Sequence, residues 1–165
     1  MIIERLIDLV VRNRREVILT TFWIALVASV VIVSYYSVYL TTVWGHWGTP
    51  FSVSPWEGPS IGAIGIIALM FTSIASGYVI KEARSLIFAY SITMLASFLI
   101  AVVFSFCYIW FALNFQVYGT IPFIWEEFLY MALVIIFRMF VPTALFVCLL
   151  GAALGSILRV YIFGE

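Results

Sequence analysis

The sequence is short of charged residues. Only 10% of its 165 residues are charged and 65% are hydrophobic, whereas about a quarter of the residues in soluble globular domains are charged. A chain of this composition folded in water would leave a large apolar surface exposed to solvent. We therefore expect an integral membrane protein, in which every spanning backbone group is hydrogen-bonded within a helix or a closed barrel.

The regular alternation of apolar and polar residues that is typical of outer-membrane strands is also missing. The apolar residues form long continuous runs instead, and each run of about 20 residues can cross a bilayer as a helix. Three runs carry no charge: residues 17–40, 60–80 and 85–113. These runs predict three transmembrane helices and exclude a β-barrel architecture.

A fourth apolar region, residues 124–163, is interrupted by Glu126, Glu127, Arg138 and Arg159. As one straight helix it would be about 60 Å long, twice the hydrocarbon thickness. We predict two pieces, an interfacial segment over 125–137 and a spanning helix over about 138–159, with Pro142 close to the start of that helix. One kinked and strongly tilted helix is the alternative.

The basic residues are unevenly distributed along the chain. Basic residues lie on one side of the predicted spans (Arg5, Arg12, Arg14, Arg15, Lys81, Arg84 and Arg159), and the acidic Glu57, Glu126 and Glu127 lie on the other side with Arg138. By the positive-inside rule, both termini are cytoplasmic, and residues 41–59 and 114–137 form external loops or interfacial segments. Residues 1–15 predict an amphipathic helix on the cytoplasmic surface. The expected fold is an all-α bundle of four transmembrane helices in a single membrane domain.

Motifs that carry chemistry are absent from the sequence. It has no P-loop, dinucleotide fingerprint, HExxH or CxxC pattern, and its two cysteines lie inside apolar runs. No Lys/Arg run suggests a nucleic-acid partner, and we expect no cofactor and no catalytic residue. An enzyme remains the least favoured class of function.

The single histidine, His46, lies in the external loop together with four other residues of interest: Trp44, Trp47, Trp56 and Glu57. Tryptophans gather at membrane interfaces because the ring is apolar and its N–H seeks a polar partner. We interpret this loop as an external cap. The alternatives are a contact surface for another protein and a metal or catalytic site formed with Glu57, Glu126 or Glu127.

Arg138 is the one basic residue inside an apolar run that lies away from the cytoplasmic ends. An arginine in this position must reach the interface, pair with an acid or face water. We therefore single it out as a candidate for a partner interface or an anion contact.

Small residues recur at helical spacing in two of the predicted spans and allow close approach of neighbouring helices. The candidate helix-packing residues are Gly58, Gly62, Gly65, Ser73, Gly77, Gly151 and Gly155. Their partner can be a helix of this chain, of a second copy or of another protein.

These features favour a non-catalytic membrane subunit of a larger assembly, surrounded by lipids and packed against other transmembrane subunits or a second copy of itself. A small homo-oligomeric channel or transporter is the alternative, since two copies could enclose a pathway that four helices alone could not.

Overall fold

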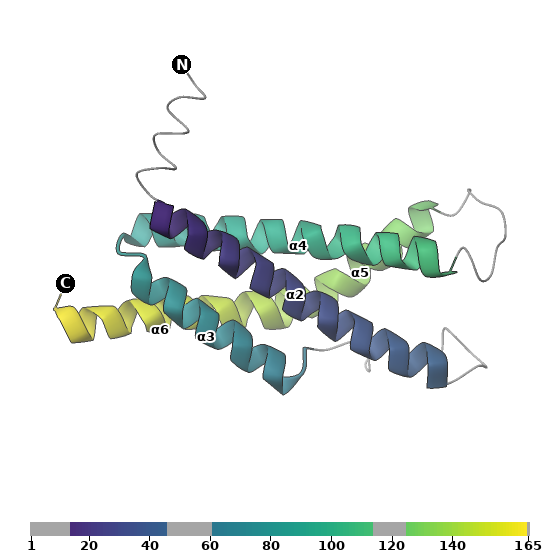
Figure 1. Cartoon of the computed structure of the whole chain (residues 1–165), viewed down its shortest axis with the longest axis horizontal. Helices are drawn as coiled ribbons and strands as arrows, with labels where there is room; N and C mark the ends of the chain where they lie inside the picture. Colours follow the sequence, from purple (N-terminus) through teal and green to yellow (C-terminus); the bar gives the residue numbers. More distant parts are fainter. Residues whose placement is uncertain (1–13, 46–60, 114–124, 165) are drawn as a thin grey trace, which may run out of the picture.

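The computed structural model describes residues 14–45, 61–113 and 125–164 (Figure 1). Within these residues the chain is helical apart from short connections, and it contains no β-strand. The predicted amphipathic helix over residues 1–15 lies outside the described residues, except for Arg14 and Arg15. His46, Trp47, Trp56, Glu57 and Gly58 also lie outside them.

The first three predicted spans correspond to three helices. They are α2 (Arg14–Gly45), α3 (Ala63–Val79) and α4 (Ala83–Leu113). Among the described residues, three stretches are long and apolar enough to cross a membrane: Arg14–Tyr36, Ala83–Tyr108 and Ala132–Ile162. The apolar α3 is shorter, with 17 residues. Three such helices in an all-helical chain indicate an integral membrane protein.

The last apolar region differs from the preferred prediction. Helix α5 (Trp125–Met139) continues into a six-residue π-helix, η2 (Phe140–Leu145), and then into α6 (Phe146–Phe163). Pro142 therefore lies inside a continuous helix and not near the start of a new one. Because proline has no N–H and clashes with the preceding turn, the helix widens locally into a π-turn. Figure 1 shows the change in direction between α5 and α6, as expected for the alternative of one kinked helix.

The helices pack side by side with alternating direction (Figure 1). Helix α3 makes its most extensive contact with α6, whereas α2 packs against α3 and α4, and α5 packs against α4. The start of α2, the connection between α3 and α4, and the end of α6 gather at one end of the molecule. This end carries the basic residues Arg14, Arg15, Lys81, Arg84 and Arg159.

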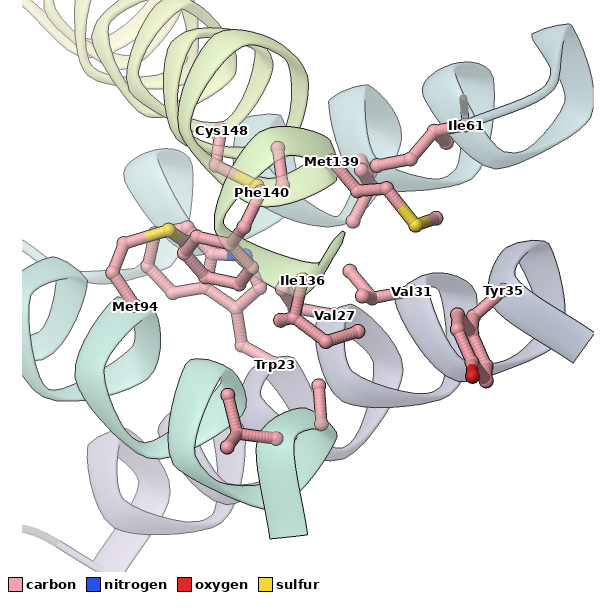
Figure 2. Close-up of a cluster of buried hydrophobic side chains, with 14 of the residues drawn as sticks. Trp23, Val27, Val31, Tyr35, Ile61, Met94, Ile136, Met139, Phe140 and Cys148 are labelled. Atoms are coloured by element: carbon pink, nitrogen blue, oxygen red, sulfur yellow. The ribbon is translucent and has the colours of Figure 1, made fainter. Parts of the chain in front are cut away.

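The interior of the bundle is filled by large apolar side chains (Figure 2). Trp23, Val27 and Val31 of α2 are fully buried, and Ile136 of α5 and Cys148 of α6 are buried with them. The outer faces carry exposed apolar side chains such as Phe71, Phe88 and Phe137. An apolar surface of this kind is suited to contact with lipid or with other transmembrane helices.

Candidate functional site

The contact between α3 and α6 is built from small residues that the sequence singled out. A Cβ atom added to Gly151 would lie 2.6 Å from the Cβ of Ser73, and one added to Gly155 or Gly77 would collide with a backbone carbonyl of the opposite helix. The four residues Ser73, Gly77, Gly151 and Gly155 thus face one another across this contact, which we call the glycine seam. The small residues of α3 therefore pack against the small residues of α6 in the same chain.

The remaining candidate packing residues lie elsewhere. A Cβ on Gly65 would lie 2.9 Å from Cγ1 of Val30, so Gly65 faces α2 and not α6. Gly62, at the N-cap of α3, has no atom within 4 Å of an added Cβ. Gly58 lies outside the described residues. Of the six candidates that the structure describes, four are therefore brought together.

An arginine lies at one end of the glycine seam, beside the C-terminus of α3. Nη1 of Arg159 on α6 donates a hydrogen bond to the carbonyl oxygen of Ile80, which caps the C-terminus of α3. The last carbonyls of a helix lack intrahelical partners and carry a partial negative charge, so a guanidinium is well suited to them. This bond ties the end of α3 to α6.

A polar cluster lies beside the glycine seam in the middle of the bundle. Nε1 of the fully buried Trp23 donates to Oγ of Ser73 at 3.2 Å, and Ser73 donates to the carbonyl of Leu69 at 2.6 Å. The Cys148 thiol lies beside both Ser73 and Trp23. The Trp23 ring also packs against Tyr90, with ring centroids 6.2 Å apart. Trp23 therefore joins α2, α3, α4 and α6.

A second hydrogen bond of this cluster reaches the π-helix. The hydroxyl of Tyr90 donates to the carbonyl oxygen of Leu145, the last residue of η2, at 3.0 Å. A π-turn around a proline disturbs the regular hydrogen-bond ladder, and side chains of neighbouring helices commonly bond to such carbonyls. Tyr90 thus connects α4 to the point where α5 and α6 meet.

The role of Trp23 and Tyr90 was not predicted from the sequence, although one signal was present. Trp23 is the only tryptophan that the predicted topology locates away from the external interface. A tryptophan deep in a span needs an internal partner for its N–H. The partner itself, Ser73, could not be identified without the packing of α2 on α3.

Most of the other buried hydroxyl groups also bond to backbone carbonyls. Ser76 donates to Thr72 of its own helix at 2.9 Å, and Ser97 of α4 donates across to Ile24 of α2 at 3.1 Å. Thr93 and Ser105 of α4 are fully buried, and their hydroxyls have no hydrogen-bond partner among the described residues. Serine and threonine in apolar helices normally bond to the preceding turn, so these two are exceptions.

Tyrosines gather at the other end of the bundle. Tyr35 and Tyr36 of α2 each pack edge-to-face against Tyr108 of α4, with ring centroids 6.4 and 5.5 Å apart. We call these three residues the tyrosine cluster. Tyrosine is enriched where a membrane meets water, because its ring is apolar and its hydroxyl is polar.

Arg138 lies on the outside of the bundle. It belongs to the last turn of α5 and is exposed, whereas Met139 and Phe140, the next two residues, are buried. The candidate span Ala132–Ile162 includes it. Among the described residues none forms a hydrogen bond or ion pair with Arg138.

The residues of the predicted external cap are not brought together by the described part of the chain. Trp44 belongs to the last turn of α2, and its neighbours in the loop lie outside the described residues. No cluster of three or more His, Cys, Asp or Glu side chains that could hold a metal occurs in residues 14–45, 61–113 and 125–164. Both cysteines, Cys107 and Cys148, are free thiols.

Compared with protein-family models, curated proteins and solved structures, the chain gives no match. The described residues form a helical bundle held together by a glycine seam and a buried hydrogen-bond cluster, and Arg138 is exposed on its apolar outer surface away from the basic end.

Proposed function

We propose that the chain is a non-catalytic integral membrane subunit of a larger membrane protein assembly. It crosses the membrane four times, with both termini cytoplasmic and residues 1–15 lying as an amphipathic helix on that surface. Its role is to pack against transmembrane helices of partner proteins.

Four spans require that the short helix α3 also crosses the membrane, and the register between α2 and α3 supports this. Ser73 lies beside Trp23, and Gly65 lies beside Val30, so the two helices run antiparallel. Helix α3 therefore extends beside most of the α2 span, and its 17 residues rise about 25 Å. A hydrocarbon core is about 30 Å thick, so α3 and its flanking residues 61, 62 and 80 together match this thickness when α3 lies close to the membrane normal.

The cytoplasmic orientation is supported by the two ends of the bundle. The basic residues gather at the end that holds the start of α2, the α3–α4 connection and the end of α6. The tyrosine cluster lies near the opposite end. Cytoplasmic segments of membrane proteins are rich in Lys and Arg, and tyrosines mark interfaces.

The observation that carries the subunit proposal is a filled interior combined with exposed apolar outer faces. The interior is filled by Trp23, Leu69, Ile136 and Met139, each at most 1% exposed, and the Trp23 and Ser73 polar atoms are bonded to each other and to the backbone. A filled interior of this kind favours a structural role over a reaction or a solute path inside one chain. The apolar outer faces remain available for other helices.

Recovery of the protein from its own membrane tests this proposal. The tagged chain is extracted in polymer-bounded lipid discs, and all proteins recovered with it are quantified by mass spectrometry. We expect one or more different membrane proteins in fixed ratio to this chain. Recovery of this chain alone, at several extraction conditions, would overturn the proposal.

A homo-oligomeric channel or transporter is the second candidate, and the outward position of Arg138 is the observation that favours it. Copies that met along this face would line their interface with an arginine, which could attract anions. Purified protein in liposomes tests this candidate. Anion flux that is lost in Arg138→Ala, with the oligomer intact, would support transport, and absence of flux for the wild-type protein would exclude it.

A further inference from the structure

We infer that Arg138 is the anchor of a partner interface: it pairs with the carboxylate of an Asp or Glu inside a transmembrane helix of a different polypeptide. The inference rests on the proposed subunit function and names the kind of helix that the subunit binds. Three observations carry it: the apolar surroundings of Arg138, its depth, and the positions of the chain's own acids.

The surroundings of Arg138 on the outer face are apolar. Val134, one turn before it, is 45% exposed, and the adjacent Phe137 is 58% exposed. Pro142, one turn after it, is also exposed. The guanidinium therefore emerges from an apolar outer surface and not from a polar groove. A cation in such a setting is stable only if an anion or water reaches it.

The depth of Arg138 follows from ring contacts along α4. Phe98 of α4 packs against Phe140 of η2, with ring centroids 5.5 Å apart. Tyr108, in the tyrosine cluster, lies ten residues after Phe98, about 15 Å along α4 toward the external end of the bundle. Arg138 lies two residues before Phe140, which moves it only about 3 Å in the same direction. The backbone of Arg138 is thus about 12 Å below the tyrosine cluster.

The direction of the Arg138 side chain brings the guanidinium only part of the way from the backbone to the level of the tyrosine cluster. Helical side chains tilt toward the N-terminus of their helix, which for α5 is the outer end of the bundle. An extended arginine covers about half of the distance to the tyrosine cluster. Lipid phosphates lie outside the hydrocarbon region, so a carboxylate on a neighbouring helix is the nearer anion. A guanidinium also forms a paired set of hydrogen bonds with a carboxylate.

Within residues 14–45, 61–113 and 125–164, a second copy of this chain offers no acid at the depth of Arg138. The four apolar runs contain no Asp or Glu apart from Glu126 and Glu127, at the outer end of the last region. Glu126 lies about 18 Å from Arg138 along the helix, and Glu16 and Glu82 lie at the cytoplasmic end. Copies related by a symmetry axis along the membrane normal keep these heights, so none of these acids meets Arg138, and we assign the acid to a different protein.

Arg159 provides an internal comparison. Its guanidinium already bonds to the carbonyl of Ile80 in the same chain. The two arginines of the last helix are therefore used differently: Arg159 stabilises the contact between α6 and α3, and Arg138 faces outward.

Two measurements on the full-length protein in its own membrane test the inference. The first compares recovery of partner proteins by wild type, Arg138→Ala, Arg138→Lys and Leu95→Ala, a control that shortens a 63% exposed side chain on α4. The second introduces a photo-crosslinking amino acid at Val134, one turn from Arg138, and identifies the crosslinked segment.

We expect Arg138→Ala to reduce recovery of one partner about tenfold, the size of a single polar contact between membrane helices. Arg138→Lys retains part of the binding, and Leu95→Ala has no effect. The Val134 crosslink falls on a transmembrane helix with an Asp or Glu, and the matching amide substitution in the partner reproduces the loss. Because Arg138 is exposed, the unfolding midpoint of Arg138→Ala in detergent stays that of wild type.

Three results would overturn the inference while leaving the subunit function standing: equal recovery of partners by Arg138→Ala, a Val134 crosslink found only on lipid, or one found only on a second copy of this chain. If the wild-type protein recovers no other chain, the proposed function itself fails. The two proposals are therefore distinguished by the recovery of partner proteins. The subunit function fails if wild type recovers none, and the role of Arg138 fails if wild type and Arg138→Ala recover them equally.

Discussion

Substitution of Gly155 by alanine should separate α3 from α6. The added Cβ would collide with the carbonyl oxygen of Ile74 and lie 2.9 Å from both the carbonyl carbon of Ile74 and the amide nitrogen of Tyr78. Non-bonded heavy atoms keep about 3.5 Å between them. Since the obstructing atoms are backbone, no side-chain rotation relieves the overlap, and the two helices must move apart by about 1 Å.

The cost of this movement can be bounded. Overpacking of a well-packed contact costs about 1–3 kcal/mol, and the higher helix propensity of alanine returns at most about 1 kcal/mol. We expect a net loss of about 1–2 kcal/mol of unfolding free energy. Gly77→Ala should behave in the same way, because its Cβ would collide with the carbonyl of Ala152. The double variant should cost less than the sum, since one displacement relieves both overlaps.

Two other glycines provide graded controls. The three nearest atoms to an added Cβ on Gly65 belong to side chains, those of Ile61, Val30 and Ser34, and not to the backbone, whereas one on Gly62 meets open space. Unfolding is followed by circular dichroism while sodium dodecyl sulfate is titrated into detergent micelles. The predicted order of destabilisation is Gly155→Ala, then Gly65→Ala, then Gly62→Ala. Equal midpoints for Gly155→Ala and Gly62→Ala would refute the account of the glycine seam.

Two further predictions concern hydrogen bonds around the last helix. Tyr90→Phe removes the donor to the Leu145 carbonyl and should lower the unfolding free energy by about 1 kcal/mol in the same titration. Tyr161 is 88% exposed, so Tyr161→Phe should leave the unfolding free energy unchanged. Equal losses for the two variants would contradict the role of Tyr90. Arg159→Ala removes the donor to the carbonyl of Ile80 and should speed amide hydrogen exchange in the last turn of α3. Unchanged exchange there would argue against this cap.

The helical class and most helix positions could be predicted from the sequence, because long uncharged runs leave few alternatives in a bilayer. The continuation of α5 through Pro142 could not. Sequence rules for proline allow either a helix start or a bend, and the outcome depends on packing: Phe140 is buried against Phe98, and Tyr90 bonds to Leu145. Contacts from α4 thus favour a π-turn over a break.

The candidate residues illustrate a similar limit. The spacing of Ser73 with Gly77, and of Gly151 with Gly155, predicts two faces for close packing but not their partner. Each face proves to be occupied by the other, so these residues leave no free surface for a second protein. Arg138 could be identified as unusual from its position in an apolar run, whereas its outward direction depends on the register of α5 on α4.

The most direct test of the account asks on which side of the membrane the two ends of α3 lie. Single cysteines are introduced at Gly62, Glu82 or Gly164 in a chain with Cys107→Ala and Cys148→Ala, and a membrane-impermeant maleimide is applied to vesicles of either orientation. We expect positions 82 and 164 to react only from the cytoplasmic side and position 62 to react only from the opposite side. Reaction of positions 62 and 82 from the same side would mean that α3 does not cross the membrane, which would contradict the four-span bundle.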